Sequence, residues 1–395
     1  MLAGMFVLAT FAAQAAQAQT LTVLHNFTDS GDEDFPVAGL TMDGAGNFYG
    51  TTHGGSGLGV GTVFRLSRGG SGWLLTTLHF FGQGNDGENP ESGVILGPDG
   101  SLYGTTYYGG GGFGTVYRLR PSPTACASAI CPWEETILYS FCSQRYCTDG
   151  GNPGLGNLVL DQAGNLYGTT FYGGASNLGV VFELTPSNGG WTESVLWSFS
   201  GYAEGENPWS GLIFDSAGNL YGTTSYGGTY GAGTVYELSP SASGWTEQTL
   251  ASSDFPSAHT YGGVVMDGQG NLFGTSGVEY GSAPGGVFEL TPSNGSWTFN
   301  VLYAFPSGPG PCDTPTLDAS GNVYGTSSGS GLYDDGEVFK LTPSNGGWTY
   351  TSVSFDGSNG ASPLGSVVLD AAGNIYGTAN LGGTGNFGTV WEITP

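Results

Sequence analysis

Basic residues are scarce in this sequence: 6 Lys and Arg stand against 32 Asp and Glu, which gives a formal net charge of −26. Proteins bind nucleic acids and anionic membrane surfaces through clusters of Lys and Arg. The sequence therefore predicts that the protein binds neither of these. Its charge favours cations, basic partners or neutral ligands instead.

Long apolar runs are also lacking. Leu2–Ala13 is an apolar stretch, but it is shorter than the roughly 20 residues that span a bilayer. It is followed by Ala16-Gln17-Ala18, a typical signal-peptidase site, although no basic residue precedes the run. We expect residues 1–18 to be a signal peptide and the mature chain to begin at Gln19. The protein should be secreted, extracellular or periplasmic, without a membrane span or C-terminal anchor.

Charged residues make up only 10% of the chain, whereas Gly contributes 75 of the 395 residues and aromatic residues 13%. Disordered chains are poor in aromatic residues, and the lack of a Gly-X-Y period excludes collagen. The composition therefore favours many short strands joined by tight turns.

An internal repeat is the strongest signal in the sequence. The phrase Gly-Asn-Leu-Tyr-Gly-Thr recurs seven times with small changes. Its aromatic residue stands at Tyr49, Tyr103, Tyr167, Tyr221, Phe273, Tyr324 and Tyr376. The spacings are 54, 64, 54, 52, 51 and 52 residues, and the long interval carries four cysteines. Four short strands in a unit of this length are typical of a propeller blade.

One unit illustrates the predicted strands. Strand A is expected over Gly211–Asp215, strand B over Leu220–Thr224, strand C over Thr234–Leu238, and strand D within Trp245–Phe255. Turn residues separate these segments, and no helical period of 3.6 residues is present. In the Asp-x-x-Gly-Asn turns between strands A and B, we expect the Asp to cap its own turn rather than to bind a metal.

The two ends of the sequence are predicted to meet. Seven A–B–C sets are followed by only six D strands, and the N-terminal segment Leu21–Phe27 resembles the D strands at Thr77–Phe81 and Ile137–Phe141. We expect it to complete the last blade, which removes an open sheet edge. The predicted fold class is all-β: a monomeric seven-bladed β-propeller with four-stranded blades, formed by residues 19–395 as a single domain.

The repeat unit resembles the GloVer tandem repeat of secreted bacterial proteins. Phe171–Trp191 and Asn271–Trp297 carry the pattern well, each with a Gly-rich loop and then Glu-Leu-Thr-Pro-Ser-Asn-Gly shortly before Trp. The second blade departs from it, with Gly97 where most units have Asp. The resemblance covers nearly the whole mature chain. It implies the propeller fold but no established activity and no catalytic residues.

Function is expected on the face that carries the D–A and B–C loops, because these loops vary while the turns on the other face do not. The B–C loops begin with Tyr beside paired glycines, and the D–A loops are acidic. The candidate ligand-binding residues are Tyr108, Tyr172, Tyr226, Trp209, Asp86, Glu88, Glu204 and Glu206. Aromatic platforms with carboxylates could bind sugars, and the acids alone could hold Ca²⁺. The alternative is that each Tyr packs between blades and the acids are solvated loop residues.

The histidines divide into two pairs. His25 and His79 occupy a strand D position that carries Tyr139, Trp197 or Tyr303 in other units, so they are interpreted as structural. His53 and His259 depart from the repeat on the favoured face. They are weak catalytic candidates, since a propeller lyase or hydrolase would need a His or a carboxylate pair near the central channel.

The cysteines are predicted to pair locally. Cys126 and Cys131 precede strand D of the second unit, and Cys142 and Cys147 follow it. A strand of nine residues spans roughly 30 Å, whereas a disulfide needs Cα atoms within about 7 Å. We therefore expect the bridges Cys126–Cys131 and Cys142–Cys147. Cys312, placed in the D–A loop before the seventh blade, is expected to remain a thiol.

These observations support three hypotheses of function. The leading one is a secreted, non-enzymatic binding or scaffolding propeller, whose ligand is a polysaccharide or another cell-surface component. The second is a secreted carbohydrate-active lyase or hydrolase that works from the same face. The third is a structural repeat protein stabilised by Ca²⁺. No cofactor is predicted apart from this Ca²⁺, and the sequence identifies no metal ligands.

Overall fold

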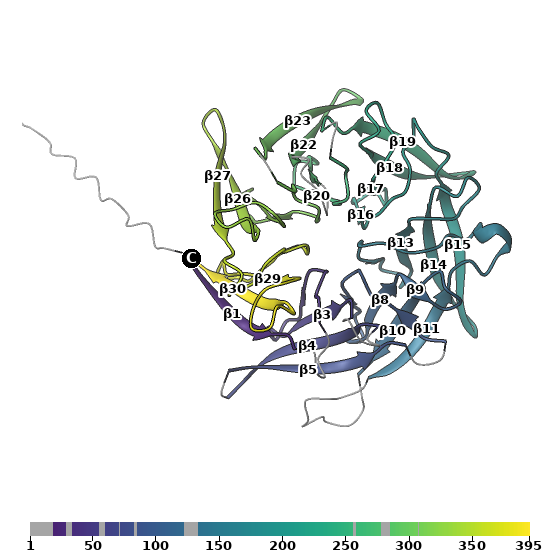
Figure 1. Ribbon diagram of the computed structural model, residues 1–395. Coiled ribbons are helices and arrows are strands. Elements are labelled where there is room, and N and C mark those ends of the chain that lie inside the picture. The colour runs from purple at the N-terminus through teal and green to yellow at the C-terminus, as the bar shows by residue number, and fades with distance from the viewer. Residues whose placement is uncertain are drawn as a thin grey trace, which may run out of the picture.

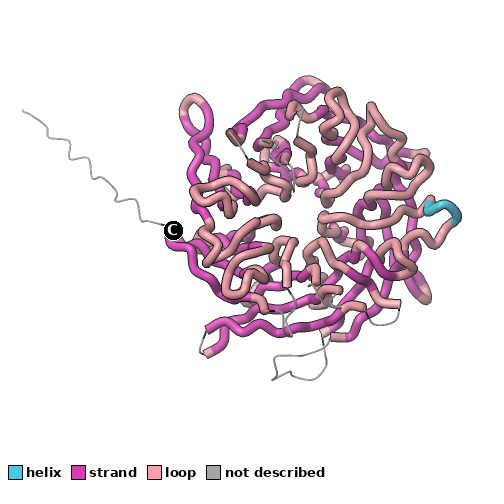
Figure 2. Tube along the Cα trace, viewed as in Figure 1, coloured by secondary structure: helices cyan, strands magenta, loops and turns pink. Residues whose placement is uncertain are grey.

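The recurring Leu-Tyr-Gly-Thr-Thr phrase forms a five-residue strand that is buried along its whole length, as in β17 (Leu220–Thr224). The computed structural model describes residues 19–28, 34–54, 60–70, 72–82, 85–121, 133–255, 258–277, 285–306 and 308–395. Within them, seven four-stranded sheets stand around a central axis (Figure 1). The helical structure of the described residues is one 3₁₀ turn, η1 (Arg145–Cys147), cyan in Figure 2. The predicted seven-bladed all-β propeller is confirmed.

Each blade runs from strand A near the axis to strand D at the rim (Figure 1). The A strands are β2 (Thr41–Met42), β7 (Ile95–Leu96), β12 (Val159–Leu160), β16 (Ile213–Phe214), β20 (Val264–Met266), β24 (Thr316–Leu317) and β28 (Val368–Leu369). The B strands are β3 (Phe48–Thr52), β8 (Leu102–Thr106), β13 (Leu166–Thr170), β17, β21 (Leu272–Ser276), β25 (Val323–Ser327) and β29 (Ile375–Ala379). The C strands are β4 (Thr62–Gly69), β10 (Thr115–Arg120), β14 (Val180–Ser187), β18 (Thr234–Ser241), β22 (Gly286–Ser293), β26 (Glu337–Ser344) and β30 (Thr389–Thr394). The D strands are β5 (Gly72–Phe80), β11 (Glu134–Ser140), β15 (Gly190–Ser198), β19 (Gly244–Ser252), β23 (Ser296–Ala304), β27 (Gly347–Ser354) and β1 (Thr20–Asn26).

The glycine of strand B is required by the packing inside each blade. A large buried ring stands directly across the B–C ladder from it, as Phe182 does opposite Gly168 and Tyr236 opposite Gly222. A Cβ atom on Gly168 would lie 2.7 Å from Phe182 Cζ, and one on Gly222 would lie 2.4 Å from the Tyr236 hydroxyl oxygen. The other blades repeat this pair as Gly50–Phe64, Gly104–Tyr117, Gly274–Phe288, Gly325–Phe339 and Gly377–Trp391. The repeat phrase therefore encodes a site for a buried ring.

The turn between strands A and B is capped by its own Asp, as predicted. Asp215 Oδ1 accepts hydrogen bonds from the backbone N–H groups of Ala217 (2.8 Å) and Asn219 (2.9 Å), and Oδ2 accepts one from Asn219 Nδ2 (2.8 Å). Burial alone would raise the pKa of Asp215, but these hydrogen bonds outweigh burial and lower it. The same three bonds recur at Asp43, Asp161, Asp267, Asp318 and Asp370. These aspartates therefore use their oxygens inside the turn.

Threonines of strand B join neighbouring blades. Thr169 Oγ1 donates to the Ser210 carbonyl oxygen at 2.7 Å, and Thr223 Oγ1 donates to that of Gly262 at 2.8 Å. These acceptors are the residues that enter the next strand A. Because Ser210 and the adjoining glycine pack against the preceding blade, they do not pair with strand B. This explains why β16 (Ile213–Phe214) begins later than the predicted strand Gly211–Asp215, and it ends before Asp215 because Asp215 caps the turn.

The two ends of the described chain close the ring. β1 pairs with β30 in antiparallel register, from Thr20 opposite Thr394 to Asn26 opposite Thr389, and Figure 1 shows the purple strand beside the yellow one. Phe27 is fully buried in a cluster that includes Phe64 of the first blade and Val390 of the last. The predicted closure by the N-terminal strand is therefore confirmed.

One of the two predicted disulfides is present. Cys142 and Cys147 are bonded across η1, in the D–A loop that follows β11. Cys126 and Cys131 lie outside the described residues, as does the predicted signal peptide at residues 1–18. Cys312 is a buried thiol, but it precedes β24 and therefore the sixth blade, not the seventh as expected. Within the part of the chain that the structure describes, no helix has the length and hydropathy of a membrane span.

Candidate functional site

The D–A and B–C loops lie on the same face and are connected by short backbone ladders. In the second blade, β6 (Gly87–Glu88) of the D–A loop pairs with β9 (Tyr108–Gly109) of the B–C loop. Isolated bridges repeat this contact as Gly151–Tyr172, Glu206–Tyr226, His259–Gly277 and Ala361–Leu381. On the face where the sequence predicts function, the D–A loops are therefore joined to the B–C loops by backbone pairing.

The three predicted tyrosines occupy equivalent places in these ladders. Tyr108 and Tyr172 are the more exposed, at 47% and 42%, and each rests edge-on against the ring of the residue before it. Tyr226 is half-buried, and its ring lies 4.6 Å from that of His259. None of the three lines the cavity at the axis described next.

A cavity of about 860 Å³ opens where the central channel meets this face. Its wall combines aromatic, aliphatic and polar side chains from the D–A and B–C loops of several blades. Among them are Phe35, His53, Glu91, Tyr107, Trp209, Asp334 and Asn380. Two of the predicted residues, His53 and Trp209, therefore meet at one cavity.

Trp209 stands in an aromatic cluster at the edge of this cavity. Its ring centroid lies 4.6 Å from that of Phe171 and 5.6 Å from that of Tyr107. Asn207, just before it, is fixed by donating from Nδ2 to the Phe171 carbonyl oxygen at 2.8 Å. The half-buried indole is thus held by its neighbours and presents a rigid apolar surface to the cavity.

His53 and Glu91 form the polar side of the cavity. His53 Nε2 lies 3.5 Å from Glu91 Oε1, and their side chains are 38% and 18% exposed. Asn89 Nδ2 donates to the His53 carbonyl oxygen at 3.0 Å and lies 3.2 Å from its Nε2. Burial, and then the nearby Glu91 carboxylate, raise the pKa of Tyr107.

Glu91 escaped the sequence analysis, although a signal for it is present. Shortly before the first paired residue of each strand A, the units carry Val37, Glu91, Leu155, Trp209, Tyr261, Cys312 and Leu364. All seven line the mouth or the upper channel. Glu91 is the only charged residue at this position, so aligning the repeats at strand A would have identified it.

Two further polar groups of the cavity wall were also missed. Within the described residues, Ser328 Oγ and Asn380 Oδ1 are buried and have no hydrogen-bond partner. Buried polar atoms are normally paired, because an unpaired one costs about 1–3 kcal/mol. They therefore offer hydrogen-bonding capacity toward a polar ligand or water.

A smaller cavity of about 260 Å³ lies on the channel among the residues that enter the A strands. Most of these residues are small, but Asp313 is acidic and buried. Burial raises the pKa of Asp313 well above its ordinary value, and Thr326 Oγ1 lies 3.4 Å from its Oδ2. A neutral Asp313 can occupy this position without an ion beside it.

The remaining predicted residues do not converge on the mouth. His259 Nδ1 contacts the Ser225 carbonyl oxygen at 3.1 Å, and His259 is absent from the cavity wall. Glu204 accepts from Ser200 Oγ (3.0 Å), and Glu206 accepts from the Tyr202 N–H (3.2 Å), so both belong to their own loop. Glu88 is half-buried in β6.

Asp86 belongs to a separate cluster at the rim. It lies beside His79, for which a structural role was predicted, and Glu135, which the sequence analysis did not select. Among the described residues, this is the one group of three His, Cys, Asp or Glu side chains whose ligand atoms are close enough to share an ion. Of the predicted acidic loop residues that the structure describes, Asp86 is the one that belongs to such a group.

The molecule is a seven-bladed β-propeller whose loops enclose a mixed aromatic and polar cavity at one mouth of its channel. The Gloeobacter/Verrucomicrobia repeat matches residues 9–130 and 128–316. Because the match spans more than half of the chain, the protein belongs to this repeat family, and the resemblance to the GloVer repeat is confirmed. No curated protein sequence matches the chain.

Several solved structures share the fold at low sequence identity. The PL25 ulvan lyase, a polysaccharide lyase solved bound to -[GlcA(1-4)Rha3S]-, aligns with a TM-score of 0.55 and 12% identity over 91% of this chain and 93% of that one. PorZ, a bacterial surface component of the type-IX secretion system of Porphyromonas gingivalis, aligns with a TM-score of 0.53 and 16% identity over 91% and 46%. A Bacteroides uniformis protein assigned as a 6-phosphogluconolactonase aligns with a TM-score of 0.52 and 16% identity over 80% of this chain and 85% of that one. At these identities the likeness shows the fold alone.

Proposed function

We propose that the protein binds a neutral carbohydrate chain at the mouth of its central channel, outside the cytoplasm. The observation that carries this proposal is the composition of the mouth cavity. Trp209 and Tyr107 provide aromatic faces for sugar rings, and His53, Glu91 and Asn380 provide polar groups for hydroxyls. A cavity with a mostly apolar wall and a few polar groups is the usual form of a small-ligand site.

The unpaired polar atoms support a ligand rich in hydroxyl groups. Ser328 Oγ and Asn380 Oδ1 lack hydrogen-bond partners in the described structure. A hydroxyl can both donate and accept, so a sugar would serve either atom. A purely apolar ligand would leave both atoms unsatisfied.

The charge of the protein supports a neutral sugar over an anionic one. Glu91 and Asp334 line the cavity, and none of the lining residues in the described ranges is Lys or Arg. The chain as a whole has a formal net charge of −26. A uronate or sulfate group would meet repulsion here without a cation to neutralise it.

Action outside the cytoplasm is supported by one sequence prediction and one structural observation. The sequence predicts a signal peptide at residues 1–18, which lie outside the described residues. The Cys142–Cys147 disulfide is compatible with export, because disulfides persist in oxidising compartments. The fold neighbours include a polysaccharide lyase and a bacterial surface component, which agrees with this proposal.

A glycan array followed by isothermal titration tests the proposal on residues 19–395. We expect neutral oligosaccharides to bind and uronate or sulfated ones to bind less. Trp209→Ala should weaken binding about tenfold, since one aromatic contact contributes roughly 0.5–1.5 kcal/mol beyond the area that it buries. Tyr172→Ala is the matched control, because this exposed aromatic lies on the same face but outside the cavity.

Two results would contradict the proposal. The first is the absence of binding across neutral, uronate and sulfated glycans. The second is binding that Tyr172→Ala weakens while Trp209→Ala leaves it unchanged, which would move the site to the loop ladders.

A hydrolase is the second candidate, because Glu91 and Asp334 line the same cavity beside His53. Most glycoside hydrolases use two carboxylates that flank the scissile bond. Incubating the bound oligosaccharide with the protein and measuring new reducing ends distinguishes the two functions. If new reducing ends form and the Glu91→Gln variant forms none, the protein is a hydrolase. If the oligosaccharide binds and no reducing ends form, it is a binding protein.

A further inference from the structure

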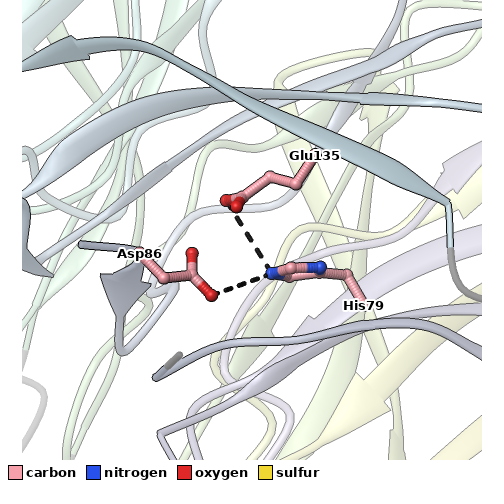
Figure 3. A group of neighbouring side chains, drawn as sticks. All are labelled: His79, Asp86 and Glu135. Carbon is pink, nitrogen blue, oxygen red and sulfur yellow. Dashed lines mark hydrogen bonds and ion pairs between the residues drawn. The ribbon is translucent and has the colours of Figure 1, made fainter. Parts of the chain in front are cut away.

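Three side chains from three segments meet at the rim, between the first and second blades (Figure 3). His79 belongs to β5, Asp86 to the loop that follows it, and Glu135 to β11 of the next blade. His79 Nε2 lies 3.1 Å from Asp86 Oδ2 and 3.7 Å from Glu135 Oε1. The three ligand atoms all lie within 4.8 Å of one another. The segments are therefore joined by polar side chains as well as by packing.

These side chains are largely withdrawn from water. Their exposed fractions are 14% for His79, 4% for Asp86 and 16% for Glu135. Glu135 Oε1 is itself buried, and within the described structure it has no hydrogen-bond partner. Burial, and then the neighbouring Asp86 carboxylate, raise the pKa of Glu135 to about 8. Two buried carboxylates thus face a single imidazole, and one of them has an unsatisfied oxygen.

The next blade junction shows what the same positions do without an imidazole. Glu193 takes the place of Glu135 across from the leucine of strand C, and Tyr139 takes the place of His79. Tyr139 Oη donates to Asp149 Oδ2 at 2.8 Å, and so pairs the loop carboxylate by an ordinary hydrogen bond. The first junction differs from the second by carrying an imidazole at this position, in contact with both the loop carboxylate of Asp86 and Glu135 of the next blade.

We propose that His79, Asp86 and Glu135 bind a divalent transition-metal cation of the zinc class between the first and second blades. Imidazole nitrogen and carboxylate oxygen are both ligands that such an ion takes. Ligand atoms around a tetrahedral zinc are separated by about 3.3 Å, from bond lengths near 2.0–2.1 Å, close to the 3.1 and 3.7 Å found here. Ca²⁺ does not fit, because it takes six to eight oxygen ligands.

The surrounding contacts orient the ligands. Asp86 Oδ1 accepts a hydrogen bond from the Gly87 N–H at 2.6 Å, which leaves Oδ2 directed at His79. The His79 ring stands edge-on to Phe81, with centroids 4.8 Å apart. Such outer contacts commonly hold metal ligands in position.

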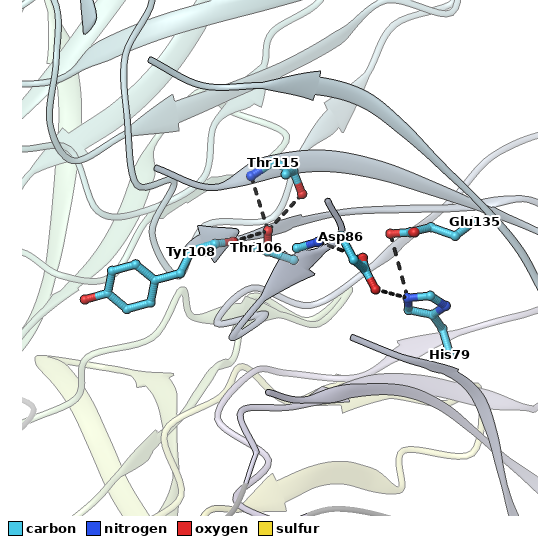
Figure 4. A network of polar contacts seen from close by, with 7 residues as sticks. His79, Asp86, Thr106, Tyr108, Thr115 and Glu135 are labelled. Carbon is cyan, nitrogen blue, oxygen red and sulfur yellow. Dashed lines mark hydrogen bonds and ion pairs between the residues drawn. The ribbon is translucent and has the colours of Figure 1, made fainter. Parts of the chain in front are cut away.

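The site is also connected to the loop face. Gly87 begins β6, which pairs with β9 at Tyr108, and Thr106 Oγ1 donates to the Tyr108 carbonyl oxygen at 2.8 Å (Figure 4). A bound cation would therefore fasten two blades together at the rim. It would also anchor the loop ladder that carries Tyr108.

Zinc binding to residues 19–395 tests the proposal. Metal-free protein should bind one equivalent of Zn²⁺, measured by elemental analysis after gel filtration, and its melting temperature should rise with Zn²⁺ because the ion binds the native state. Ca²⁺ at the same concentration should have no such effect. His79→Tyr copies the residue of the second junction and removes a ligand. It should weaken Zn²⁺ binding by at least about a hundredfold, because losing even a residue that only supports a ligand can weaken binding by that much.

Two further variants complete the test. Glu135→Gln keeps the size of the side chain and should also lose the ion, so the proposal can be tested even if His79→Tyr folds poorly. Glu193→Gln changes the matching residue at the second junction and should bind Zn²⁺ as the parent does. No stoichiometric Zn²⁺ binding by the parent, or binding unchanged in both His79→Tyr and Glu135→Gln, would overturn the proposal.

Discussion

At the scale of single residues, the glycine of strand B sets how closely the buried ring of strand C can approach. A Cβ atom on Gly168 would lie 2.7 Å from Phe182 Cζ and 2.9 Å from Leu158. Both neighbours are buried in a packed cluster and have little room to move. Gly168→Ala should therefore cost about 1–3 kcal/mol in the free energy of unfolding, the usual penalty for overpacking a core.

Denaturant unfolding measures this cost, and Gly268→Ala is its matched control. Gly268 lies in a turn, where an added Cβ atom would have no neighbour within 4 Å, and its φ is not positive. Its replacement should change stability by less than about 1 kcal/mol. Equal effects of the two substitutions would show that the strand B glycine is not selected by the ring.

Glu193 gives the protein a predictable dependence on pH. Burial, and then the Asp149 carboxylate, raise its pKa to about 7 from an ordinary value of 4.5. The folded state therefore keeps a proton that the unfolded state releases between pH 4.5 and 7. The contribution of Glu193 to stability is fully present below pH 4.5 and is lost as the pH rises through 7.

Glu193→Gln removes this dependence. We expect the variant to gain stability relative to the parent between about pH 5 and about pH 8, as measured by urea unfolding at both values. Glu135, with a pKa of about 8, titrates in both proteins and cancels in the difference. The same stability difference at both pH values would contradict the assignment.

At the scale of elements, the strand at the N-terminal end is the one on which the ring depends. β1 supplies the outer edge of the seventh blade, and Phe27, just after it, is fully buried against the first blade. Deleting Leu21–Phe27 exposes an unpaired β30. Loss of Phe27 alone should cost about 3–5 kcal/mol.

Thermal melting measures this effect. We expect the deletion to lower the melting temperature by more than about 10 °C, from roughly 2–4 °C per kcal/mol in a chain of this order of size, and to favour aggregation. A chain that begins at Thr20 keeps β1 and should melt like one that begins at Gln19. A deletion variant that also melts at that temperature would refute closure by β1.

The strands were largely predictable from the sequence, because their signals lie within one repeat. Strand B of the fourth unit begins and ends at the predicted residues, Leu220 and Thr224. Strand A is shorter than predicted, since the residues before Ile213 bond to the preceding blade. That bond joins residues 41 positions apart, and no local pattern reveals it.

At the scale of the whole molecule, the candidate sites could be predicted only in part. Trp209 was found because it interrupts the repeat, and His53 for the same reason. Glu91 stands out only when the repeats are aligned at strand A, whereas Glu135 was missed because it meets His79 across a blade junction. His79 and Glu135 are far apart in the sequence and meet only because the first and second blades pack side by side. A pattern within one repeat unit does not predict which residues of two neighbouring blades come into contact.

The central claim is that the mouth of the channel, not the loop ladders, binds the carbohydrate. A crystal structure of residues 19–395 with the tightest oligosaccharide from the glycan array tests it most directly. We predict a sugar ring stacked on Trp209, with hydroxyls within hydrogen-bonding distance of at least one of His53, Glu91 and Asn380. A sugar bound at Tyr108 or Tyr172, or on the opposite face, with the mouth left empty, would contradict the account.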